Sequence, residues 1–146
     1  MRKNLSAAFD SVTAQVSVRV PTDLEVVEEA VDVVARHCLS TGLPPRRARF
    51  NLRIALCEAL SNAIIYGNEM DPAKVVVVDI NATHHHVTIR VEDEGNGFDP
   101  SAVPEPSLPD DIEATGGRGL YLIRKLVDDV YFNDQGNAIC MVLRRA

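Results

Sequence analysis

The sequence has no tryptophan, few aromatic residues and no long apolar run. Aromatic residues make up 5% of its 146 positions, and no apolar stretch approaches the roughly 20 residues that a membrane helix requires. The basic start, Met1 to Ser6, is not followed by the apolar stretch typical of a secretory signal peptide. We therefore expect a cytoplasmic protein without a membrane span, folded as one domain over residues 1–146 with residues 1–13 flexible.

Cysteine is also scarce, with three residues at Cys38, Cys57 and Cys140. Their number is odd, their spacing is wide and each lies among apolar neighbours, which predicts buried free thiols rather than disulfides or a zinc site. The run from His84 to His86 lies between two strand-like segments. Consecutive side chains cannot all face one ion, so this run predicts a hairpin turn rather than a metal site.

The charge balance disfavours nucleic acid as a direct partner. The net charge is −6, and the phosphates of nucleic acid would repel such a chain. Basic residues nevertheless gather at Arg46, Arg47, Arg49 and Arg53. This cluster is either the solvated start of a helix or a docking patch for an acidic protein partner.

Hydrophobic periodicity predicts strands and helices in the order β-α-α-β-β-loop-α-β-β. Thr22–Glu25 has the form of a capping box before an amphipathic helix, and a second helix runs from Pro44 to about Tyr66. The expected strands cover 16–20, 74–80, 87–91, 130–133 and 138–143, and a third helix covers 116–128. Because hairpins join several strands, we expect an α/β (α+β) two-layer sandwich with a mixed, mostly antiparallel sheet and helices on one face.

Two polar residues interrupt the second helix, which is otherwise apolar nearly all round from Ile54 to Ile65. Glu58 and Asn62 are four residues apart, so they share one face of the helix. This face either meets solvent or lines a cleft that holds a cation and a polar ligand. Carboxylate and amide oxygens suit Mg²⁺, and the carboxylate could also serve as a general base.

Three further segments combine glycine with charge. Asp93 continues the inward spacing of the strand at 87–91 and is either a turn residue or an acceptor for a ligand donor such as the amine of adenine. Gly116–Leu120 comes directly before a helix, where backbone N–H groups and Arg118 can meet phosphate. The proline-rich and acidic segment between them, within 94–115, is either a lid or a disordered insertion.

Together these pieces resemble the GHKL ATPase superfamily, which includes gyrase and the histidine kinases. Glu58–Ala63 resembles the N-box, Asp93–Phe98 the first glycine box and Gly117–Leu120 the second. Three motifs in the family's order imply a Bergerat-type ATP-binding fold. Within the superfamily the chain most resembles the anti-sigma-factor serine/threonine kinases, because of Asn62–Asn68 and Gly117–Ile123.

The resemblance implies a role for each motif residue. Asn62 would hold Mg²⁺, and Glu58 would be the general base for a serine hydroxyl on a partner. Asp93 would bind the adenine amine, and the remaining motif residues would shape the adenine pocket (Gly95, Gly97) or contact phosphate (Gly117, Arg118, Gly119, Leu120). Residues 94–115 would form the ATP lid.

The resemblance also implies partners: a sigma factor, an anti-anti-sigma protein of the STAS type, and a second copy of the chain. Val16, Val18 and Val20 could form the edge strand of such a homodimer. One departure is Gly136–Ala138, where the family often has a threonine that supports the adenine contact. Alternative functions are a nucleotide-dependent binding module without significant kinase activity, plain ATP hydrolysis, and the catalytic part of a histidine kinase. The last is disfavoured because no helical hairpin carries a phospho-accepting histidine.

Overall fold

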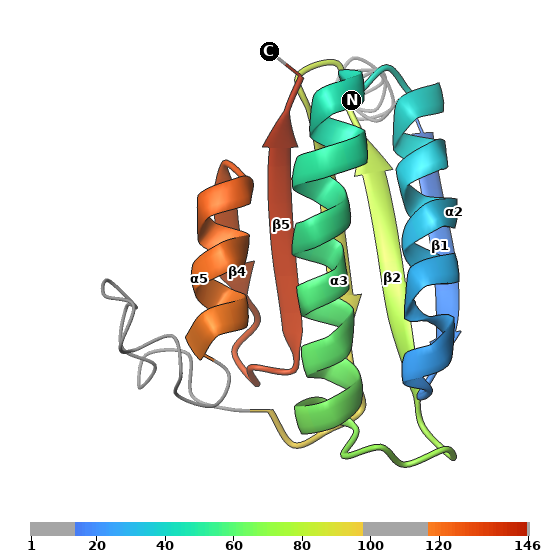
Figure 1. The fold of residues 1–146 in the computed structure, drawn as a ribbon. Coiled ribbons are helices and arrows are strands. Elements are labelled where there is room, and N and C mark those ends of the chain that lie inside the picture. Colours follow the sequence, from blue (N-terminus) through green and yellow to red (C-terminus); the bar gives the residue numbers. More distant parts are fainter. Residues whose placement is uncertain (1–13, 98–116, 146) are drawn as a thin grey trace, which may run out of the picture.

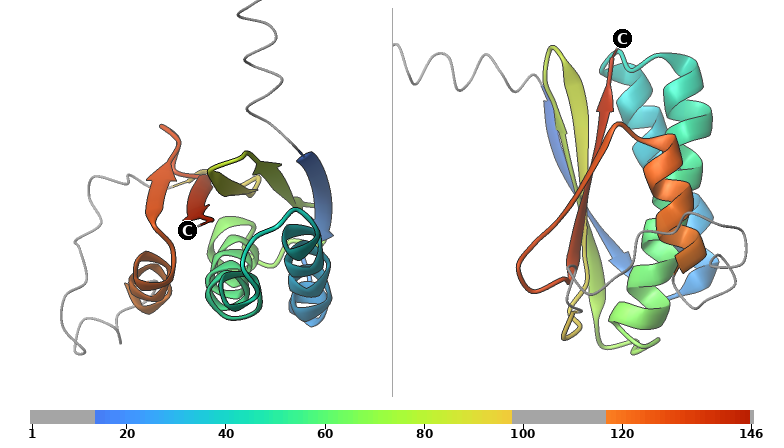
Figure 2. Two further views of the ribbon diagram at one scale, coloured as in Figure 1. Left: turned by 90° about the horizontal axis from the view of Figure 1, so that it is seen from above. Right: turned by 90° about the vertical axis from the view of Figure 1, so that its left-hand side faces the viewer.

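A computed structural model describes residues 14–97 and 117–145 of the chain. In these ranges one five-stranded sheet carries three helices, α2, α3 and α5, and all three lie on the same face of the sheet (Figures 1 and 2). The strands are β1 (Ala14–Pro21), β2 (Val75–Ala82), β3 (His86–Glu92), β4 (Asp129–Phe132) and β5 (Ala138–Arg144). The helical segments are η1 (Leu24–Val26), α2 (Val27–Ser40), η2 (Arg47–Leu52), α3 (Arg53–Asn62), η3 (Ala63–Gly67) and α5 (Gly117–Leu126). The predicted two-layer α+β sandwich is therefore confirmed.

The strand order is β1-β2-β3-β5-β4, and every pairing in it is antiparallel. β3 is the central strand, with β2 and β5 on either side. Because both neighbours run opposite to β3, the residues that follow β3 lie beside the starts of β2 and β5. Segments distant in sequence are thereby brought together at one end of the sheet, where β3 ends and where β2 and β5 begin.

The core lies between the sheet and its three helices. Alternate residues of β2 and β3 are buried, as in a sheet with one covered face (Val76, Val78, Ile80 and Ala82; Val87, Ile89 and Val91). On α3, two pairs of adjacent residues face this layer (Ala55 and Leu56, Ala59 and Leu60). Each large side chain buried in this way contributes about 1.5–3 kcal/mol.

The second helix is one continuous rod, as predicted, but it contains two π-helical segments. η2 precedes α3, and η3 follows directly after Asn62. In η3 the backbone N–H of Asn68 donates to the carbonyl of Ala63 at 2.7 Å, a bond that spans five residues. Such wide turns are frequent at functional sites.

Two local predictions were wrong. Thr22 does not cap a helix: Asp23 is the N-cap, and its carboxylate accepts a hydrogen bond from the N–H of Glu25 at 2.9 Å. The three thiols are free, but only Cys38 is buried, whereas Cys57 is exposed and Cys140 is half-buried. Cys57 and Ile65 are exposed on α3 and η3 in the described part of the structure, although their neighbours in sequence are apolar.

Two of the four clustered arginines form ion pairs with carboxylates of other segments of the chain. Arg47 pairs with Asp128 at 2.9 Å, and Arg53 pairs with Asp32 at 2.5 Å. Arg46 lies over the ring of Phe50, 5.8 Å from its centre. Arg47 and Arg53 therefore have structural contacts within the chain.

Among the described residues, no helix has both the length and the apolar composition needed to cross a membrane.

Candidate nucleotide site

Glu58 and Asn62 lie on one face of α3, as predicted, and both are half-buried. Gly119, in the first turn of α5, lies against this face. A Cβ atom at position 119 would be 2.8 Å from the amide nitrogen of Asn62 and 3.1 Å from a carboxylate oxygen of Glu58. Only glycine therefore leaves the two polar groups in place. The structure thus brings the predicted second glycine box against the predicted N-box.

The C-terminal end of α5 is fastened to the rod that contains α3. Asn51 donates a hydrogen bond to the carbonyl of Leu126 at 2.9 Å, which satisfies a carbonyl group at the end of α5. Asp128, just beyond, accepts from Arg47 and also from the N–H of Arg144 at 2.7 Å. These contacts explain why the N-terminal glycine turn of α5 reaches Glu58 and Asn62 further along the rod.

Asp93 lies at the opposite end of the site, immediately after β3. Its carboxylate packs against Gly67 at the end of η3, and a Cβ atom at position 67 would overlap it. One carboxylate oxygen accepts a hydrogen bond from the N–H of Gly95 at 2.8 Å. A Cβ atom at position 95 would in turn overlap the carbonyl of Gly67. The end of η3 and the first glycine box are therefore in direct contact.

The environment of Asp93 disfavours its charged form. Burial raises the pKa of this carboxyl group, Glu92 adds to the shift, and the bond from Gly95 and the charge of Lys74 oppose it. Burial has the largest effect. A carboxylate that is partly desolvated and has room for further hydrogen bonds is a strong acceptor for a ligand donor.

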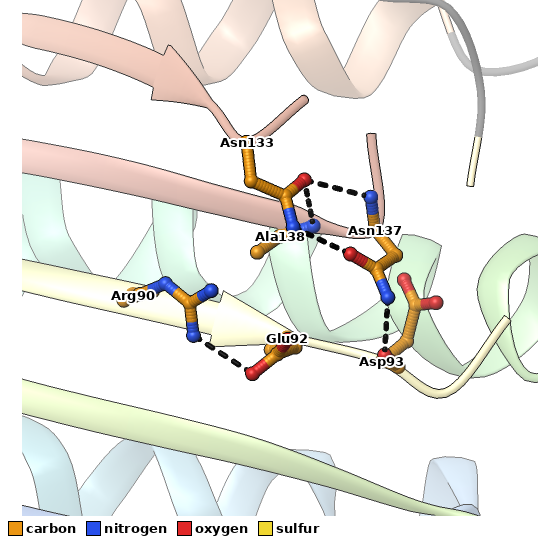
Figure 3. Close-up of polar contacts among 6 residues, drawn as sticks. All are labelled: Arg90, Glu92, Asp93, Asn133, Asn137 and Ala138. Carbon is orange, nitrogen blue, oxygen red and sulfur yellow. Dashed lines mark hydrogen bonds and ion pairs between the residues drawn. The ribbon is translucent and has the colours of Figure 1, made fainter. Parts of the chain in front are cut away.

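An asparagine pair holds the backbone of Asp93 from the side of β5 (Figure 3). The N–H of Asp93 donates to the carbonyl of Asn137 at 2.9 Å, and the side-chain amide of Asn137 donates to the carbonyl of Asp93 at 3.3 Å. Asn133 orients Asn137: its amide donates to the Asn137 side-chain oxygen at 2.6 Å, and its oxygen accepts from the Asn137 N–H at 3.0 Å.

Asn137 stands in the stretch where the resemblance leads us to expect a threonine. Its side chain bonds the main chain of Asp93 rather than the carboxylate, so it fixes the position of Asp93 without occupying the carboxylate. The turn between β4 and β5 also touches the first glycine box. Gly97 has a φ of 80°, and a Cβ atom there would overlap the carbonyl of Gln135. This contact explains the glycine at position 97.

The predicted site residues thus form two groups, one beside α3 and one at the end of η3. Glu58 and Asn62 meet Gly119 beside α3, whereas Asp93 and Gly95 meet Gly67 at the end of η3. Gly117 begins α5 and Leu120 is buried in it, but the side chain of Arg118 lies outside the described part of the structure. Residues 98–116, which contain most of the predicted lid, also lie outside it.

The sequence alone indicated no part in the site for four polar residues that support it: Thr22, Asn68, Asn133 and Asn137. The signal that could have found Asn68 is a polar residue directly after a long apolar helix, next to a glycine. Among the described residues, no three His, Cys, Asp or Glu side chains cluster as a protein-only metal centre would require.

Comparison with known proteins agrees with this geometry. The histidine kinase-like ATPase domain matches residues 20–143, so the chain belongs to that family. A protein named serine-protein kinase RsbW, from Oceanobacillus iheyensis, is 28% identical over 98 residues, which are 63% of this chain and 62% of the relative. A protein named anti-sigma F factor, from Clostridium perfringens, is 31% identical over 101 residues, which are 62% of this chain and 69% of the relative.

These relatives place the chain more narrowly, in the anti-sigma-factor kinase family of the GHKL superfamily. A serine-protein kinase RsbW from Listeria innocua is also 30% identical over 98 residues, 62% of either chain. The matched part covers less than two thirds of both RsbW relatives. An ATPase domain implies ATP binding, and the names of the relatives support kinase activity at the level of the family.

Proposed function

We propose that this chain is a cytoplasmic protein serine/threonine kinase and anti-sigma factor. It binds Mg²⁺ and ATP, phosphorylates a serine on an anti-anti-sigma partner of the STAS type, and switches between that partner and a sigma factor. One observation carries the proposal: the face of α3 that bears Glu58 and Asn62 lies directly against Gly119 of the second glycine box. This contact supports a site in which Glu58 is the base and the turn at Gly119 binds phosphate.

In the proposed complex, the two groups of the site bind opposite ends of ATP. Asp93 accepts a hydrogen bond from the adenine amine, and the close packing that Gly67, Gly95 and Gly97 allow holds Asp93 and its loop in place. The N-terminal turn of α5 meets the phosphates, because a helix start presents free N–H groups and a positive partial charge. Gly117, Arg118, Gly119 and Leu120 belong to this turn.

The residues around α3 fit a magnesium ion held together with nucleotide phosphates. Asn62 and Glu58 offer oxygen atoms, the ligands that Mg²⁺ prefers, and Gly119 leaves the space beside them free of a side chain. Mg²⁺ in this place would neutralise phosphate charge. We assign the metal-ligand role to Asn62, which leaves Glu58 available as a base.

The transfer step then needs a base and correct alignment. Glu58 takes the proton of the partner's serine hydroxyl as the serine oxygen bonds to the γ-phosphorus. The bond from that phosphorus to the β–γ bridging oxygen breaks, and its electron pair leaves with ADP. The continuous helix of α3 and η3 carries Glu58 and contacts Asp93 through Gly67, so the distance between the two groups is set by this helix. A nucleotide bound at Asp93 would therefore place its γ-phosphate at a defined position relative to Glu58.

A phosphotransfer assay tests the proposal. The purified chain, Mg²⁺ and γ-labelled ATP are mixed with each STAS-domain protein encoded near it, and label is expected on a serine of one of them. Asn62→Ala is expected to lower the rate about tenfold at fixed ATP by weakening the magnesium–nucleotide complex. Ser61→Ala is a matched control, because Ser61 is the neighbouring half-buried polar residue on α3.

The other outcomes discriminate between functions. Tight ATP binding without transfer to any of the STAS proteins would indicate a nucleotide-dependent binding regulator without significant kinase activity. Phosphate release without a labelled protein would indicate plain ATP hydrolysis. Failure to bind ATP would contradict the site itself.

We also propose that the chain is a homodimer joined through β1. Within residues 14–97 and 117–145, this strand is at the edge of the sheet and pairs only with β2, and its inward residues Val16 and Val18 are half-buried. An unpaired strand edge with apolar residues is a ready surface for a second copy. Light scattering is expected to give twice the mass of one chain. A mass equal to one chain at every concentration would contradict the dimer.

A further inference from the structure

Asn68 is one of two buried polar or charged residues among the described positions, and its side chain is fully inaccessible to solvent. It follows η3 directly and lies beside the first glycine box. A fully buried side-chain amide is costly unless its donors and acceptor are all paired. The bonds of Asn68 therefore indicate what the residue holds in place.

The side chain of Asn68 connects three separate segments. Its amide donates to the hydroxyl of Thr22 at 3.0 Å and to the carbonyl of Val75 at 3.1 Å. Its oxygen accepts a hydrogen bond from the N–H of Glu94 at 2.7 Å. The hydroxyl of Thr22 in turn donates a hydrogen bond to the carbonyl of Lys74 at 2.6 Å, so the donors and the acceptor of the Asn68 side chain are all paired.

The bond to Glu94 completes a series along the first glycine box. Three consecutive N–H groups are paired there: that of Asp93 with the carbonyl of Asn137, that of Glu94 with Asn68, and that of Gly95 with the Asp93 carboxylate. The bond from Glu94 ties this loop to the end of η3 through the side chain of Asn68. Asn68 therefore relates the position of Asp93 to the helix that carries Glu58 and Asn62.

The chain after Asn68 adopts an unfavourable conformation. Glu69 has a φ of 52° and Met70 a φ of 61°, in the left-handed region that residues other than glycine rarely adopt. Such a conformation persists only where surrounding contacts determine it. Asn68 supplies those contacts on one side of the turn, and the N–H of Asp71 donates to the Asn68 carbonyl at 3.0 Å.

We propose that Asn68 is a positioning residue that sets nucleobase selectivity by holding the Asp93–Gly95 loop through the Glu94 N–H. The inference rests on the proposed function, in which the Asp93 carboxylate accepts a hydrogen bond from the adenine amine. Guanine carries a carbonyl where adenine carries that amine, so Asp93 favours ATP over GTP only while it is correctly placed. Asn68 acts through the loop and has no contact with the nucleotide itself.

The test measures ATP and GTP affinity by competition against a fluorescent ADP analogue. Asn68→Ala is expected to weaken ATP binding about fivefold and to leave GTP binding unchanged, so that the preference for ATP falls by the same factor. Asn68→Asp keeps an oxygen that can accept from the Glu94 N–H but loses both donors. We expect this variant to be less stable and yet to retain the preference for ATP.

Thr22→Val is the matched control, because it removes another bond of the same network and leaves the Glu94 bond intact. It should lower the melting temperature without changing the ratio of the two affinities. A purely structural role would instead change both affinities together in Asn68→Ala and in Thr22→Val, and that result would overturn the inference. If Asn68→Ala does not fold, loss of the ATP preference in folded Asn68→Asp overturns it equally. Absence of ATP binding in the unaltered chain would refute the proposed function instead.

Discussion

Replacing Glu58 with glutamine is expected to reduce phosphoryl transfer by about 10²–10⁴-fold and to leave ATP binding nearly unchanged. Glutamine has almost the same shape as glutamate, so the packing against Gly119 is retained. It cannot take a proton from the serine hydroxyl, so only the chemical step is affected. The rate of label transfer to the partner and the dissociation constant of ATP, measured on the same preparation, separate the two effects.

A matched carboxylate provides the control for this variant. Glu28 is exposed in the first turn of α2, near Cys57 of the neighbouring helix. Burial has the largest effect in raising the pKa of the Cys57 thiol, and the charges of Glu58 and Glu28 add to it. Glu28→Gln removes the same charge from the neighbouring helix and is expected to leave transfer unchanged. Transfer by Glu58→Gln at the rate of the unaltered chain would show that Glu58 is not the base.

Asp93→Asn is expected to weaken ATP binding by about 10–150-fold without a loss of stability at neutral pH. The variant loses a charge-assisted hydrogen bond to adenine, which is worth about 1.5–3 kcal/mol. Its side-chain oxygen can still accept from the N–H of Gly95. Because burial disfavours the charged carboxylate in the folded chain, the neutral amide should be tolerated at least as well.

The raised pKa of Asp93 also predicts how pH affects the stability of the folded chain and its affinity for ATP. The effect on stability has the opposite sign to that of a salt-bridged carboxylate. The folded chain holds the Asp93 proton more tightly than the unfolded chain does. The contribution of Asp93 to stability is therefore greatest at low pH and is lost as pH rises from the ordinary value, 3.8, through the raised one. ATP affinity should change in the opposite direction and fall as pH falls through the raised pKa, because protonation removes the charged acceptor.

Calorimetric titration of ATP and thermal unfolding at several pH values check both parts of this prediction. Asp79→Asn is the control: Asp79 alternates with the buried Val78 and Ile80, so it lies on the face of the sheet opposite α2, α3 and α5. It should not affect ATP binding. Equal ATP affinity in Asp93→Asn and the unaltered chain would show that Asp93 does not bind the nucleotide.

The site was predictable from sequence as far as it depends on periodicity. The spacing of Glu58 and Asn62 within an apolar helix put them on one face, and continuation of the β3 pattern directed Asp93 toward the helices. The structure agrees with both. The capping box at Thr22 failed because a local motif competes with distant partners, and Thr22 instead bonds Lys74 and Asn68.

The sequence by itself determined the elements, their order and the helix face that carries Glu58 and Asn62, because these follow from repeats of two and of three to four residues along the chain. Only the tertiary structure decided that Gly119 lies against that face, that Gly67 and Asp93 touch, and that Asn68 and Asn137 hold the Asp93–Gly95 loop from two sides. Those contacts join segments 25 or more residues apart. They depend on the antiparallel sheet order and on the packing of α5, which no periodicity along the chain encodes.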